Sequence, residues 1–101
     1  MSITVEFNGT IASIVLSKGI DYSTQEDFRK ANTQVLSTEG VTEIYVNFGE
    51  ATFLDSSGIR ALLVLKKEAD AIGKALVLLN CNENMRNIFE IGGFDRIFTF
   101  R

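Results

Sequence analysis

The chain has 101 residues and a mass of 11.2 kDa, a length that fits one domain over residues 1–101. Its 46% of hydrophobic residues and 23% of charged residues are typical of a globular domain rather than of a disordered chain. Histidine is absent and there is one cysteine, which excludes a Ser-His-Asp triad, a histidine-liganded metal, a multi-cysteine zinc site and an intramolecular disulfide within this chain. The net charge of −3 argues against nucleic-acid binding, because counterion release needs a basic surface.

The hydropathy pattern predicts a cytoplasmic protein that is not attached to a membrane. No run approaches the ~18 apolar residues of a membrane span, and the first residues carry no basic segment followed by an apolar one. The single cysteine, Cys81, follows an apolar run, so we expect a partly buried thiol. The small size and the net charge favour a chain that is monomeric when free, and nothing in the sequence predicts a cofactor or a metal site.

The first forty residues predict a β-hairpin followed by a helix. Apolar residues alternate over residues 3–7 and 11–16, and the Asn-Gly pair between the two runs is a strong hairpin signal. The apolar spacing then changes to three or four residues, which indicates a helix. Ser23 and Glu26 have the spacing of a capping box at the start of this helix, and Gly40 is expected to close it.

Strands and helices alternate over the rest of the chain. Residues 75–79 are apolar and bounded by Gly and Asn, which predicts a strand buried on both faces. Glycines at 73 and at 92–93 are expected to end helices. The predicted elements are a strand at 41–48, a connection at 49–54, a helix at 55–73, the strand at 75–79, a helix at 84–91 and a strand at 96–100. The order ββαβαβαβ predicts an α/β domain with a mostly parallel sheet, an antiparallel hairpin at its N-terminal edge and helices packed against it.

The segment Asp55-Ser56-Ser57-Gly58 lies where the connection enters the second helix. Asp55 is a suitable N-cap, because its carboxylate can accept hydrogen bonds from the first-turn N–H groups and is favoured by the helix dipole. Ser56 and Ser57 lie in the first turn, and Gly58 permits another surface to come close. Capping alone does not require two serines and a glycine.

Three interpretations of this segment are open. The first is a plain capped helix start. The second makes Ser56 a nucleophile, which without histidine needs a desolvated lysine as base, and Lys66 and Lys67 lie two or more turns further along the helix. The third makes Ser56 the acceptor of a phosphate from another protein, because the N-terminus of a helix suits an anion. The chain has no Walker-type loop and no G-x-G-x-x-G run, so nucleotide binding is not expected.

The run from Phe53 to Ile59 resembles the signature of the STAS domain, the sulphate transporter and anti-sigma factor antagonist family. Gly19-Ile20-Asp21 is similar to the turn that precedes the first helix in that family, and the resemblance extends over nearly the whole chain. It implies that Ser56 is phosphorylated by a GHKL-type serine kinase that is also the anti-sigma factor. It further implies that the unphosphorylated form binds this kinase, and that a metal-dependent serine phosphatase restores that form.

By the same resemblance, Asp21, Asp55, Ser57 and Gly58 are expected to shape the contact with the kinase. The sequence departs from the family where relatives often have Leu-Asp-Leu, since it reads Val-Asn-Phe over residues 46–48. We expect a binding protein and not an enzyme. The alternative is a constitutive subunit that docks on a transporter or another complex without any phosphate.

Overall fold

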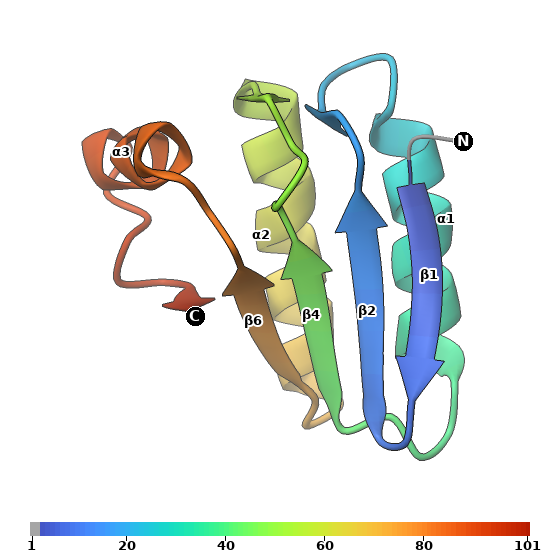
Figure 1. Cartoon of the computed structure of the whole chain (residues 1–101). Coiled ribbons are helices and arrows are strands. Elements are labelled where there is room, and N and C mark those ends of the chain that lie inside the picture. The colour runs from blue at the N-terminus through green and yellow to red at the C-terminus, as the bar shows by residue number, and fades with distance from the viewer. Residues whose placement is uncertain (1–2) are drawn as a thin grey trace.

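A five-stranded sheet forms the centre of the molecule, which is described over residues 3–101 by a computed structural model (Figure 1). Strands β1 (Ile3–Asn8) and β2 (Ile11–Leu16) form the predicted antiparallel hairpin. The sheet order is β1-β2-β4-β6-β7, and every pair after the hairpin is parallel. The later strands are β4 (Glu43–Asn47), β6 (Ala75–Leu79) and β7 (Thr99–Phe100). The predicted fold class is therefore confirmed.

Two long helices, α1 (Gln25–Ser37) and α2 (Ser56–Ala71), cover one face of the sheet, and α3 (Glu83–Ile91) lies beyond β6 (Figure 1). The core lies between that face and the two long helices, because alternate strand residues and one stripe of each helix are apolar. Its largest fully buried side chains include Phe28, Phe48, Phe89, Ile14 and Leu62.

A second sheet of two short strands was not predicted. Strand β3 (Gly19–Ile20) pairs in parallel with β5 (Phe53–Leu54), which lies inside the segment expected to be a connection. Two residues are too few to show an alternating pattern, so the sequence contains no signal for either strand. The pairing is close, since a side chain on Gly19 would overlap the carbonyl oxygen of Phe53.

The predicted capping box of α1 is wrong. The helix begins at Gln25, with Thr24 as an N-cap residue that makes no side-chain capping bond. The backbone N–H groups of Ser23 and Thr24 instead donate to the carboxylate of Asp21, at 2.9 and 3.0 Å. Ser23 is therefore held in a turn ahead of the helix, and Glu26 pairs with Arg29 at 3.3 Å instead of reaching back.

The C-terminus of α1 is closed by Lys74, a lysine from the connection between α2 and β6, and not by Gly40. The helix ends at Ser37, and Gly40 lies in the following turn with φ +85°. The Lys74 ammonium donates to the carbonyl oxygens of Val35, Leu36 and Thr38, at 3.1, 2.9 and 2.9 Å. A cation suits this position, because the last carbonyls of a helix lack partners and carry its negative dipole end.

Smaller differences concern the C-terminal third. Helix α3 begins at Glu83, because the side chain of Asn82 accepts a hydrogen bond from the Met85 N–H at 2.8 Å and caps the helix. The strand predicted over 96–100 is reduced to its last residues, since a turn occupies the segment before them. Cys81 is half-buried as expected, and burial raises the pKa of its thiol to about 11.

Candidate functional site

Two aspartates form matching turns at the starts of the two long helices. The Oδ1 atom of Asp21 accepts from the Ser23 hydroxyl at 2.7 Å and from the Thr24 N–H at 3.0 Å. The Oδ1 atom of Asp55 accepts from the Ser57 hydroxyl at 2.7 Å and from the Gly58 N–H at 3.0 Å. Each carboxylate thus binds the hydroxyl two residues later and the backbone three residues later, which fixes the entry of the chain into α1 and α2.

The pairing of β3 with β5 brings these two turns side by side. Asp21 and Asp55 directly follow the two strands, and the Asp55 N–H donates to the Ile20 carbonyl at 3.3 Å. The pKa of each carboxyl is lowered, chiefly by the hydrogen bond from the serine two residues later. Their mutual repulsion acts in the opposite direction on Asp55 but is a smaller effect. Both groups are therefore carboxylates at neutral pH, and the turns form one negatively charged surface.

The two serines of the motif have different roles. The Ser57 hydroxyl is engaged, because it donates to Asp55. The Ser56 side chain is exposed, and its hydroxyl has no hydrogen-bond partner among residues 3–101. Ser56 is consequently the serine whose hydroxyl can be modified without breaking a bond of the turn. The structure places Asp21, Asp55, Ser56 and Ser57 together, while their roles in a phosphorylation or partner site stay predictions.

Gly58 is buried, and the surface that comes close to it is β3 of the same chain. A Cβ atom at Gly58 would lie 2.6 Å from the Ile20 carbonyl oxygen and 2.7 Å from a methyl carbon of Leu54. The glycine therefore lets the first turn of α2 pack directly on β3, the strand that Asp21 follows. Its predicted share in a partner contact stays a prediction, and its observed role is to hold the two turns together.

Asn47, where relatives often have aspartate, serves as a link inside the molecule. Its Oδ1 atom accepts from the Gly49 N–H at 2.8 Å and from the Asn80 side chain at 3.1 Å. This ties the ends of β4 and β6 at the sheet edge from which the chain continues towards Asp55. An amide forms these bonds without adding a negative charge to the ends of the two strands.

The geometry gives the serine-nucleophile interpretation no support. Lys66 lies ten residues after Ser56 on the same helix, which corresponds to about 15 Å along the axis, and its ammonium pairs with Asp70 at 2.7 Å. Within residues 3–101, no cluster of three or more Cys, Asp or Glu side chains is placed to hold a metal ion. In the same part of the chain, no helix has both the length and the apolar character needed to cross a bilayer.

Asp21 was expected beside Asp55, but its turn was not predicted to have the same hydrogen-bond pattern as the Asp55 turn. The signal was available, because Asp-Tyr-Ser at 21–23 and Asp-Ser-Ser at 55–57 share the spacing of aspartate and serine. Tyr22 occupies in the first turn the place that Ser56 has in the second, and its side chain is 80% exposed. Aromatic side chains are enriched at protein–protein interfaces, so an exposed ring at this position favours a protein-binding surface.

Comparison with known proteins gives consistent matches. The sequence matches the STAS domain family over residues 2–101. It is 31% identical over 91 residues to a STAS-domain containing protein of Pseudomonas aeruginosa, covering 90% of this chain and 88% of that protein. It is 30% identical over 74 residues to an anti-sigma F factor antagonist of Lysinibacillus sphaericus, covering 73% of this chain and 63% of the relative.

Solved structures of the anti-sigma factor antagonist SpoIIAA of Bacillus are similar to this structure. The TM-score is 0.76 for the unphosphorylated form and 0.75 for the phosphorylated form, at 26% sequence identity in both cases. The alignments cover 98% of this chain and 86% and 90% of the two SpoIIAA chains. The structure is thus about equally similar to both forms.

Proposed function

Because the chain belongs to the STAS domain family, we propose that it is a protein-binding regulator switched by phosphorylation, an anti-sigma factor antagonist. Its unphosphorylated form binds a GHKL-type serine kinase that is also an anti-sigma factor, and phosphorylation of Ser56 releases it. A metal-dependent serine phosphatase restores the binding form. The kinase needs ATP, so we place this cycle in the cytoplasm.

The observation that carries the proposal is the free hydroxyl of Ser56. It is exposed at the N-terminus of α2, next to a serine whose hydroxyl is already bonded to Asp55. A phosphate at this position suits the helix dipole and the nearby N–H groups, so the fold tolerates the modification. The names of the relatives, and the existence of SpoIIAA in two phosphorylation states, support the same role.

The switch follows from the charge that the phosphate adds. Phosphorylation adds about −1.5 to −2 charges beside the carboxylates of Asp21 and Asp55. A carboxylate of a partner about 6 Å from this phosphate is repelled by about 1.4 kcal/mol in water, or about tenfold in affinity. At an effective dielectric constant near 20 the same repulsion is about four times larger. A partner that closes tightly over the turns is therefore displaced without any refolding of the domain.

Peptide-resolved mass spectrometry of the protein isolated from its own cells tests the proposal. We expect phosphate on Ser56, with an occupancy that changes between two growth conditions. The Ser56→Ala variant is expected to give no phosphopeptide and to bind the kinase constitutively. The control is the same substitution at the neighbouring serine, Ser57→Ala, which is expected to remain phosphorylated on Ser56.

Two results would contradict the proposal. A Ser56 that is unmodified under all conditions favours the constitutive subunit that docks on another complex. Partner binding and signalling by Ser56→Ala that equal those of the native chain under all conditions would likewise favour the constitutive subunit. Ser56→Asp is expected to weaken kinase binding only in part, because a carboxylate has less charge than a phosphate.

A further inference from the structure

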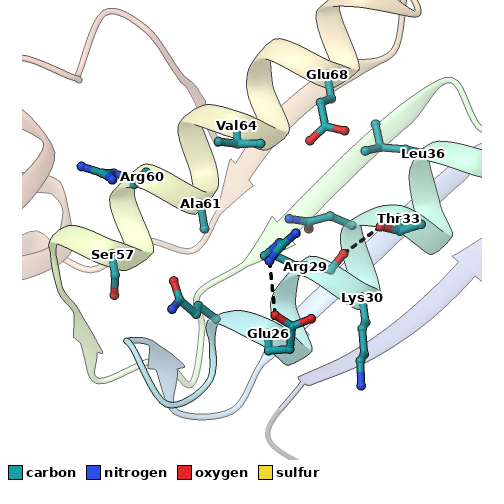
Figure 2. Close-up of a pocket in the computed structure, with 12 residues that line it drawn as sticks. Glu26, Arg29, Lys30, Thr33, Leu36, Ser57, Arg60, Ala61, Val64 and Glu68 are labelled. Carbon is teal, nitrogen blue, oxygen red and sulfur yellow. Dashed lines mark hydrogen bonds and ion pairs between the residues drawn. The ribbon is translucent and has the colours of Figure 1, made fainter.

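A groove of about 330 Å³ runs between α1 and α2 and reaches the first turn of α2 at Ser57 (Figure 2). Its apolar lining consists of Ala61 and Val64 of α2 and Leu36 of α1. Val64 is 51% exposed. The volume is at the lower end of the ~300–1,000 Å³ of ligand pockets, which suits one side chain and a short length of backbone.

The floor of the groove contains a buried amide that the chain does not satisfy. Asn32 of α1 is 6% exposed, and among residues 3–101 no other polar or charged residue is buried. Its buried Oδ1 atom has no hydrogen-bond partner in that part of the chain, and its Nδ2 group forms no bond there either. A buried amide without partners is costly, and native proteins rarely contain one.

The requirement of Asn32 identifies the kind of group that would complete the groove. An asparagine amide carries one acceptor and a pair of donors, and its two ends exchange places when the side chain turns over. A ligand that carries a donor and an acceptor next to each other can therefore bond whichever end of the amide faces the groove. The peptide unit is such a group, and consecutive residues of an extended segment present an N–H and a C=O together.

Charge in the groove points to a basic residue beside the apolar one. Arg29 is compensated by Glu26 at 3.3 Å. Lys30 and Arg60 also line the groove, but their charged ends point away from the space between the helices (Figure 2). The Glu68 carboxylate points towards α1 and has no ion pair among residues 3–101. The uncompensated charge that faces the groove is therefore negative, as is the net charge of the chain.

We propose that the α1–α2 groove binds an extended peptide segment of a partner protein that carries an aliphatic residue followed by a basic residue. The peptide backbone bonds to Asn32, the aliphatic side chain lies on Ala61 and Val64, and the basic side chain faces Glu68. This inference goes beyond the proposed switch and does not depend on phosphorylation of Ser56. A partner held in the groove would nevertheless extend next to Ser56, since Ser57 lines the groove.

The first experiment is an NMR titration of the full ¹⁵N-labelled chain with the blocked peptide acetyl-Ala-Leu-Lys-Ala-amide. We expect saturable shifts of the Asn32 side-chain amide signals and of backbone signals in the facing parts of α1 and α2. Affinity on the order of 1 mM suits a probe with so few contacts. Peptides with Ser in place of Leu, or Glu in place of Lys, are expected to bind at least tenfold more weakly.

Variants separate binding from folding. Asn32→Leu, which replaces the unsatisfied amide by an apolar group of similar size, is expected to raise the melting temperature by about 4 °C or more and to lose peptide binding at least tenfold. Gln34→Leu on the exposed side of α1 is the control and is expected to change neither. Val64→Gln alters an exposed position and is expected to weaken binding without lowering stability. Ser56→Ala is expected to bind the peptide as the native chain does. Peptide binding in the groove and the phosphorylation switch at Ser56 are therefore tested separately.

Three results would overturn the inference. Absence of shifts at 10 mM peptide, on the order of ten times the expected dissociation constant, means that the groove does not bind such a segment. An Asn32→Leu variant that melts at a lower temperature means that the amide is satisfied within the fold. If the same signals shift when the protein concentration is raised without peptide, the groove binds a second copy of the chain instead.

Discussion

Replacement of Gly58 by alanine tests whether the two aspartate turns are held together by close packing. The added Cβ atom would lie 2.6 Å from the Ile20 carbonyl oxygen, a backbone atom that cannot rotate away. An ordinary contact at this position begins at 3.4 Å, so the first turn of α2 has to move by about 0.8 Å away from β3. The same carbonyl accepts from the Asp55 N–H at 3.3 Å, so the shift also weakens the link between the turns.

The expected cost follows from two opposing effects. Overpacking of this kind costs about 1–3 kcal/mol, and alanine recovers at most about 1 kcal/mol because it is a better helix former than glycine. We expect the free energy of unfolding to fall by about 1–2 kcal/mol, which corresponds to a decrease of about 5–15 °C in melting temperature for a domain of this size. An exposed helical glycine would show the opposite sign.

Thermal and urea unfolding followed by far-ultraviolet circular dichroism measures this change. Ser56→Ala, two residues earlier in the same turn and exposed, is the control and is expected to stay within about 0.5 kcal/mol of the native chain. The folded Gly58→Ala protein is also expected to bind its partner more weakly, because Asp55 is displaced from Asp21. A melting temperature equal to or above that of the native chain would refute the close packing of α2 on β3.

Three further predictions follow from single contacts. Lys74→Met is expected to lower the free energy of unfolding by about 1–3 kcal/mol through loss of the α1 cap, measured by urea unfolding against the exposed control Lys67→Met. The pKa values of Asp21 and Asp55 are lowered, so the folded chain binds fewer protons in acid than the unfolded chain. The stabilisation from these two carboxylates is complete above about pH 4 and is lost as the pH falls through their lowered pKa values. Asp55→Asn is therefore expected to make the urea midpoint depend less on pH between pH 5 and pH 2.5. With a pKa of about 11 instead of 9.0, Cys81 has about 100-fold less thiolate than an ordinary cysteine, so it is expected to react with a disulfide reagent about that much more slowly in the native chain than in urea.

The strands and helices of the main sheet could be predicted because each is long enough to show a period. Alternation over β1, β2 and β4, and three- or four-residue spacing over α1 and α2, arise from burial of one face, which the sequence records directly. The N-cap role of Asp55 was also predictable, because it is a contact within four residues. Local chemistry failed at Ser23 and Glu26, because a carboxylate two residues before the expected cap accepts from the Ser23 N–H that the Glu26 side chain would have bound, and also from the Thr24 N–H.

Features that depend on contacts between distant segments could not be predicted. Lys74 reaches carbonyls 36 to 39 residues earlier in the chain, and no local pattern distinguishes it from the exposed lysines of α2. Strands β3 and β5 exist because they pair with each other across more than thirty residues. The unsatisfied amide of Asn32 follows from the packing of α1 against α2, and in sequence it is an ordinary polar residue in a helix.

The contrast between Ser56 and Ser57 explains how one turn combines a rigid fold with a reversible signal. A phosphate on Ser57 would remove the donor of the 2.7 Å bond to Asp55 and place two negative groups in contact, so the turn and the start of α2 would bear its cost. The Ser56 side chain contributes no hydrogen bond to the turn among residues 3–101, so a phosphate there leaves the Asp55 bonds in place. The phosphate then changes mainly the binding free energy of a partner that contacts the surface formed by Asp21 and Asp55. A switch built in this way changes partner affinity with little change in the stability of the domain. The helix dipole acts on a first-turn phosphate by about 0.3–1 kcal/mol, so the free energies of unfolding of the phosphorylated and unphosphorylated protein should agree within about 1 kcal/mol although their partner affinities differ.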